Sequence, residues 1–110
     1  DIEASIRFLS THEGGREGFA LEGYRPQFYY DGQDHDAVHK FPDVERAYPG
    51  QTVRSLVTFL HPAFHWRKVH PGKTFKLREG HRVVADGLVT KLLKLEESVR
   101  KFPEDSCRDG

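Results

Sequence analysis

The chain has 110 residues, 36% of them hydrophobic and 31% charged, and its 17 basic and 17 acidic side chains give a formal net charge of zero. This length predicts one domain with a modest core, and the neutral charge argues against a protein that coats nucleic acid generally. No apolar run approaches the roughly 20 residues of a membrane helix, and no signal peptide opens the chain. The lone Cys107 cannot form an internal disulfide, which fits a cytoplasmic protein. Methionine is absent, which suggests an excised or processed segment.

Apolar and polar residues alternate with a period of two, which predicts β-strands. In chain order, we expect strands at residues 2–8, 28–30, 37–41, 51–60, 73–78 and 82–93. A tight turn at 79–80 joins the last two, and Gly87 inside the last strand indicates a bulge or a close backbone approach. Short strands separated by Gly and Pro predict an all-β fold, a six-stranded antiparallel closed barrel.

The chain changes character near residue 94. Leu95, Val99 and Phe102 have helical spacing, which predicts one or two helical turns that end at Pro103. We therefore expect a barrel over residues 1–95 and a C-terminal extension over 96–110, with a polar and mobile end.

Catalytic and cofactor motifs are missing. No Gly-rich phosphate loop occurs, so we expect no nucleotide binding and no GTP hydrolysis by this chain. His35 and His39 are four residues apart, and so are His61 and His65, a spacing that binds metal on one helix face. Here both pairs fall in strand ends and loops, so we expect surface histidines, one or two packed ones, and no metal site. We expect no enzymatic activity and no cofactor.

Basic residues gather late in the chain. Residues 61–82 hold a single acid, Glu79, and six bases: Arg67, Lys68, Lys73, Lys76, Arg78 and Arg82. Two interpretations stay open. The segment forms a positive patch for one defined contact, or it is simply a solvated basic hairpin.

The most distinctive segment is Gly-Tyr-Arg-Pro-Gln-Phe-Tyr-Tyr at 23–30, in which Gly and Pro fix the backbone around an arginine and a glutamine. Further segments follow the same order as in one known family: Glu-Gly-Gly-Arg at 13–16, Tyr-Pro-Gly at 48–50, Val-Thr-Phe-Leu-His-Pro at 57–62, Leu-Arg-Glu-Gly-His-Arg at 77–82 and Gly-Leu-Val-Thr-Lys-Leu-Leu at 87–93. Over residues 2–95 the chain thus resembles the C-terminal β-barrel domain (domain III) of translation elongation factor Tu, without the GTPase domain.

The resemblance implies a binding barrel that contacts the T-stem backbone of aminoacyl-tRNA and packs against translation proteins. By position, Gln27, His61, Glu79 and Gly80 match motif positions at the tRNA face, and Arg25 projects from the same turn. A glutamine amide or a carboxylate can bond a ribose 2′-hydroxyl, and a glycine permits close backbone approach. Contact with tRNA by an isolated barrel is expected to be weak.

Three departures from the family pattern bear on this expectation. A loop expected at 31–36 carries three added acids, and Asp36 stands where the family has a threonine that contacts tRNA. His81 replaces the second glycine of the last hairpin turn. The C-terminal extension is the third departure.

The loop at 63–72 is about four residues longer than in the family. It carries Phe64, Trp66, Arg67 and Lys68, residue types that anchor protein interfaces. Trp66 either anchors a partner or folds back to cap the barrel. The alternative function is therefore a protein–protein adaptor or mimic that reuses the barrel and has no role in tRNA delivery.

Overall fold

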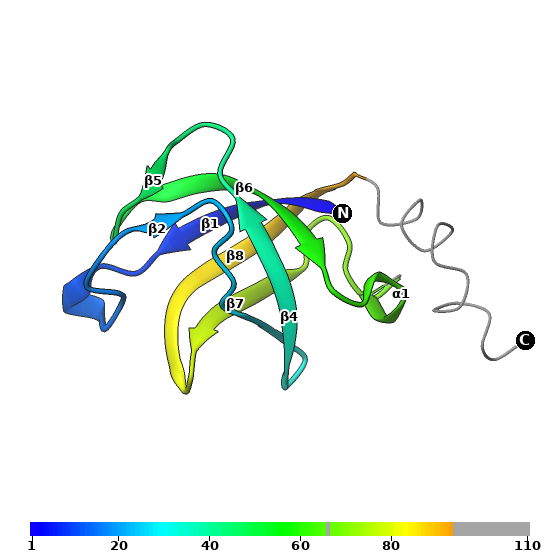
Figure 1. Ribbon diagram of the computed structural model, residues 1–110. Helices are drawn as coiled ribbons and strands as arrows, with labels where there is room; N and C mark the ends of the chain where they lie inside the picture. Colours follow the sequence, from blue (N-terminus) through cyan, green and yellow to red (C-terminus); the bar gives the residue numbers. More distant parts are fainter. Residues whose placement is uncertain (66, 94–110) are drawn as a thin grey trace, which may run out of the picture.

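The computed structural model describes residues 1–65 and 67–93. Within them, six strands close into an antiparallel barrel in the order β1-β6-β4-β3-β7-β8 (Figure 1). The strands are β1 (Ile2–Phe8), β3 (Gln27–Tyr30), β4 (Gln33–Lys40), β6 (Thr52–Phe59), β7 (Thr74–Glu79) and β8 (Arg82–Leu92). The six-stranded barrel expected from the alternating pattern is confirmed.

Short elements cover the two ends of the barrel. They are the 3-10 helix η1 (Thr11–Glu13), the two-stranded ribbon of β2 (Ala20–Leu21) and β5 (Arg46–Ala47), and helix α1 (Pro62–His65). The sequence pattern predicted none of them, because segments of two to four residues are too short to show a repeating alternation. No helix in the described part of the chain is long and apolar enough to span a membrane.

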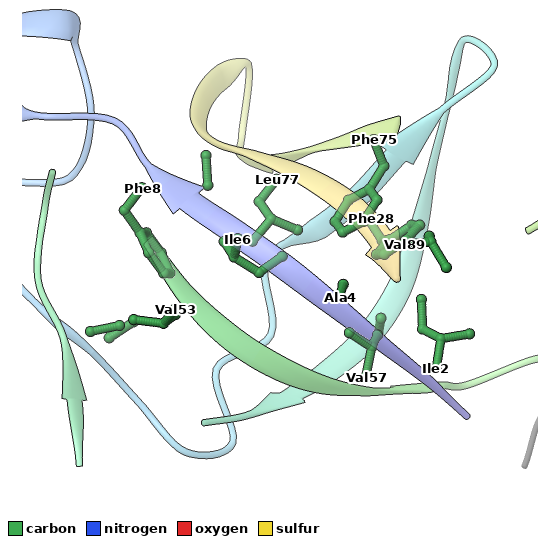
Figure 2. Packing of buried hydrophobic residues seen from close by; sticks show 14 of the residues in the cluster. Ile2, Ala4, Ile6, Phe8, Phe28, Val53, Val57, Phe75, Leu77 and Val89 are labelled. Atoms are coloured by element: carbon green, nitrogen blue, oxygen red, sulfur yellow. The ribbon is translucent and has the colours of Figure 1, made fainter. Parts of the chain in front are cut away.

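The inward side chains of the strands form the core (Figure 2). On β1, Ile2, Ala4, Ile6 and Phe8 are all buried, as their alternation predicts. Phe28 lies at the centre of an aromatic group, where its ring stacks on that of Phe75 at 4.0 Å between centroids.

Gly87 on β8 is paired directly with Phe75 on β7. A Cβ atom at this position would lie 2.1 Å from the Phe75 ring, so only glycine lets the two strands pack here. Of the two expectations for Gly87, the close approach is confirmed. The register of β7 and β8 shifts between Leu77 and Arg78 instead.

β4 begins earlier than the sequence predicted. Residues 33–36 were expected in a loop and only 37–41 in a strand, but the strand runs from Gln33 to Lys40. A two-residue turn makes this possible, because Asp31 (φ 49°) and Gly32 (φ 80°) both adopt the positive φ of a type I′ hairpin. Asp34 and Asp36 are therefore fixed on the outer face of a strand. The expected helical turns and the extension after residue 95 lie outside the described residues.

Candidate nucleic-acid interface

Gln27 lies at the start of β3, between two neighbouring strands. The register pairs it with Asp36 on β4 and with Arg78 on β7. The Leu60 amide donates to the Asp36 carbonyl oxygen at 3.2 Å, and His61 follows and lines the same pocket as Asp36. We call Asp36, Gln27 and Arg78, together with the adjoining His61, the cross-strand row. His61 is the residue after Leu60, which bonds Asp36, so two of the expected RNA-binding positions, Gln27 and His61, lie near one acid.

The turn before β3 holds Arg25 beside this row. Gly23 adopts a φ of 90° and donates its N–H to the His39 carbonyl at 2.8 Å, so the turn is fastened to β4. Tyr24 packs against the core and Pro26 is buried, while Arg25 between them is exposed. The turn is therefore a structural clamp that leaves Arg25 exposed, and a contact of Arg25 or Gln27 with RNA or a partner stays a prediction.

Glu79 is engaged inside the protein. Its Oε2 atom accepts from the Arg16 guanidinium and, at 2.5 Å, from the Tyr24 hydroxyl. Burial, followed by the Glu79 carboxylate, raises the pKa of Tyr24, so the hydroxyl keeps its proton and donates. This cluster ties the loop after β1 to the end of β7. The Glu79 Oε2 atom is therefore engaged by Arg16 and Tyr24, and the expected bond of this carboxylate with RNA stays a prediction.

Gly80 and His81 form the exposed tip of the β7–β8 hairpin. Gly80 has a φ of 63°, whereas His81 is not among the residues with positive φ, which is the pattern of a type II′ turn. Only the first position of such a turn needs a glycine, so His81 replaces the family's second glycine without strain. The Gly80 backbone stays open to a ligand.

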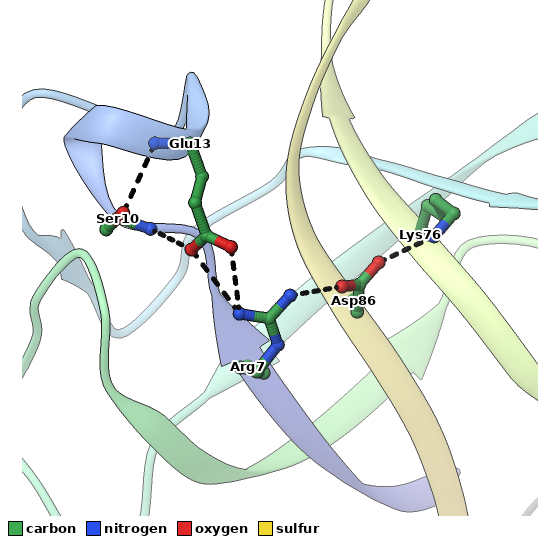
Figure 3. A network of polar contacts seen from close by, with 5 residues as sticks. All are labelled: Arg7, Ser10, Glu13, Lys76 and Asp86. Atoms are coloured by element: carbon green, nitrogen blue, oxygen red, sulfur yellow. Dashed lines mark hydrogen bonds and ion pairs between the residues drawn. The ribbon is translucent and has the colours of Figure 1, made fainter.

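The basic residues of 67–82 do not form a free positive patch. Three of them are in ion pairs with acids from distant segments: Lys73 with Asp31 at 2.7 Å, Lys76 with Asp86 at 2.6 Å, and Arg78 with Asp34 at 3.8 Å. Asp86 also accepts from Arg7, which in turn bonds Glu13 (Figure 3). The outer face is one of mixed charge, and the structure favours the interpretation of a solvated hairpin.

The enlarged loop after β6 begins with α1. The Phe64 side chain is 43% exposed, and the Lys68 ammonium lies 3.7 Å from the centroid of its ring. Arg67 is also exposed, with a φ of 69°. Trp66 lies outside the described residues, so the choice between anchor and cap stays a prediction. The exposed part of this loop remains a candidate partner surface.

Two of the histidines belong to the interior. His39 is fully buried and its Nδ1 atom lies 2.8 Å from the Ser55 hydroxyl, while His65 is 2% exposed and its Nδ1 lies 2.7 Å from the Tyr30 hydroxyl. Burial lowers the pKa of His39 to about 4. Burial, followed by the charges of neighbouring His35, Lys68 and His61, lowers the pKa of His65 to about 3. Among residues 1–65 and 67–93, no group of three or more His, Cys, Asp or Glu residues is placed to hold a metal ion.

Comparison with known families gives one match that spans the barrel. The sequence model of the family described as the elongation factor Tu C-terminal domain matches residues 1–93. The matched region includes all six barrel strands, the turn around Arg25 and the cross-strand row. The match covers most of the chain, and the barrel agrees with the fold that the resemblance implied. This chain belongs to the elongation factor Tu C-terminal domain family.

Proposed function

We propose that the chain is a non-catalytic binding module that contacts the phosphate and sugar backbone of RNA, with aminoacyl-tRNA as the expected ligand. The proposal rests on the pairing of Gln27 with Asp36 and Arg78, and on His61, which adjoins this row and shares a pocket with Asp36. Exposed Arg25 and the Gly80 turn add a cation and an accessible backbone to the same group of strands.

The chemistry of these residues suits backbone recognition. The Gln27 amide can donate to a 2′-hydroxyl or a phosphate oxygen, and Arg25 can pair with a phosphate. None of these contacts reads the edge of a base. Binding should therefore tolerate changes of RNA sequence.

The electrostatics of the face make this contact weak for the barrel alone. Asp36 belongs to the row and Asp34 precedes it on β4, and both carboxylates repel phosphate. Arg78 already shares its charge with Asp34. A phosphate must compete with that carboxylate for the Arg78 guanidinium. We therefore expect binding that falls steeply as salt rises.

The test is the affinity of the chain for tRNA, measured by fluorescence anisotropy at about 50 mM and about 200 mM salt. Gln27→Ala should weaken binding by about fivefold, the equivalent of one hydrogen bond of ~1 kcal/mol. The control is Thr52→Ala, an exposed residue at the start of β6 that pairs with Arg7 away from the row. If the two substitutions change the tRNA affinity equally, or if the affinity does not depend on salt concentration, the row is not an RNA contact.

A second candidate is a protein-interaction adaptor, favoured by the exposed Phe64 ring on the enlarged loop. A translation-related protein is the expected partner. Phe64→Ala should leave the melting temperature nearly unchanged if the ring serves a partner. A large drop in melting temperature would show that Phe64 stabilises the fold, which would weaken the case for a protein-interaction adaptor.

A further inference from the structure

The β3–β4 hairpin and helix α1 border an open pocket of about 480 Å³. β4 contributes Asp34, His35 and Asp36, and the segment that contains α1 contributes His61, Phe64 and His65. The pocket shares Asp36 and His61 with the cross-strand row, and its remaining wall comes partly from the enlarged loop. Its chemistry differs from that of the row, because it combines aromatic rings with carboxylates.

Three rings form one continuous aromatic wall. The His35 ring lies 4.9 Å from Phe64 and 4.8 Å from His65, and Phe64 lies 5.3 Å from His65, all between centroids. The core holds His65 in place, because its ring stacks on that of Phe59 at 3.9 Å between centroids and its Nδ1 atom bonds the Tyr30 hydroxyl. The wall is thus held in place before any ligand arrives.

The wall carries no positive charge near neutral pH. Burial is the largest cause that lowers the pKa of both His35 and His65, so both rings are neutral in ordinary buffers. A neutral aromatic ring attracts a cation to its face. Lys68 already lies over the Phe64 ring, so a ligand cation has to stack on the other face of that ring or displace this ammonium.

The pocket also carries negative charge. Asp34 is held by Arg78 at 3.8 Å, but Asp36 is exposed and makes no ion pair with any residue that the structure describes. An unpaired carboxylate beside aromatic rings matches a cation and repels the phosphates of RNA. Charge complementarity therefore favours a cation over a phosphate as the ligand of this pocket.

We propose that this pocket binds an arginine side chain of a protein partner. The planar guanidinium stacks against Phe64 and His35, and its N–H groups donate to the Asp36 carboxylate. Arginine fits better than lysine, because only a guanidinium stacks on a ring and bonds a carboxylate through two N–H groups at once. The enlarged loop thus supplies one side of a recognition site for a basic peptide segment.

The test uses N-acetyl-arginine amide as the probe and N-acetyl-citrulline amide, its uncharged analogue, as the control, both titrated into the isotope-labelled chain by NMR. We expect saturable shifts at His35, His61 and Phe64 with the arginine probe only. Asp36→Asn and Phe64→Ala should each weaken that binding about tenfold. Asp43→Asn, which removes an equal charge beside Arg54, should leave it unchanged.

Several results would overturn the proposal. Equal binding of the citrulline probe would show that the pocket does not recognise the positive charge. Chemical-shift changes near acidic residues on all faces of the barrel would show non-specific attraction. Stronger binding of guanosine monophosphate than of the arginine probe would assign the pocket to RNA. The test is separate from that of the RNA contact, because Asp36→Asn should weaken the arginine probe but strengthen tRNA binding.

Discussion

The buried pair of His39 and Ser55 makes the stability of the barrel depend on pH. His39 is fully buried, and its Nε2 atom has no hydrogen-bond partner among the described residues. Burial lowers its pKa from 6.5 to about 4, so the folded state holds the ring neutral at a pH at which the unfolded chain protonates it. The unfolded state then binds more protons, and stability falls as pH drops from about 6.5 towards 4.

The size of the effect follows from the two pKa values. Between pH 7 and pH 5, the His39 shift removes about 2 kcal/mol from the free energy of unfolding. His65, whose pKa is lowered to about 3, should remove a similar amount over the same interval. Together they amount to about 4 kcal/mol, a large fraction of the stability of a small domain.

Urea unfolding at pH 7 and pH 5 measures this loss. The matched variant is His39→Phe with Ser55→Ala, which removes the titrating ring together with its partner and keeps an aromatic ring near Tyr24 and Phe41. The variant should lose only about half as much stability as the wild type. Equal losses in both proteins, or no loss in the wild type, would refute the assignment of a neutral buried His39.

Three other predictions follow from the fold. Gly87→Ala should lower the free energy of unfolding by about 1–3 kcal/mol, because the added Cβ displaces the Phe75 ring. The control, Leu88→Ala at an exposed position, should change it little. Equal melting temperatures of the two variants would contradict the close packing at Gly87. Glu79→Gln should cost about 1 kcal/mol by weakening the bond from Arg16, and an unchanged melting temperature would mean that the cluster does not stabilise the loop. Circular dichroism should show a β-rich spectrum that a chelator does not alter, and unfolding by the chelator would contradict this. Calorimetry with GTP or GDP should show no heat of binding, and micromolar nucleotide binding would contradict this.

The barrel was predictable from the sequence because most strands alternate strictly. β1 is the clearest case, with four buried residues at every second position. Only the first half of β4 was missed, because it is polar on both faces, with Asp34 and Asp36 outside and a histidine, His35, on the inner side. Only the turn chemistry of Asp31 and Gly32 marks where that strand begins.

The candidate interface was predictable in part. The resemblance supplied Gln27, His61 and Gly80; the register pairs Gln27 with Asp36, and His61 lies one residue beyond the partner of Asp36 and lines the same pocket. The engagement of Glu79 was not predictable, because its partner Arg16 is 63 positions away in the sequence. Two of the three ion pairs of the basic segment, Lys73 with Asp31 and Arg78 with Asp34, join residues more than 40 positions apart, so composition alone overstated its free charge.

The central claim is that RNA contacts the face around the cross-strand row. The most direct measurement is the affinity of tRNA for Asp36→Asn compared with Asp43→Asn, at about 50 mM salt. Both substitutions remove one negative charge, but Asp36 lies beside Gln27 while Asp43 pairs with Arg54 on β6. The account predicts that Asp36→Asn strengthens binding about fivefold or more and that Asp43→Asn has a much smaller effect. Equal changes in the two variants, or no change in Asp36→Asn, would contradict an RNA contact at this face.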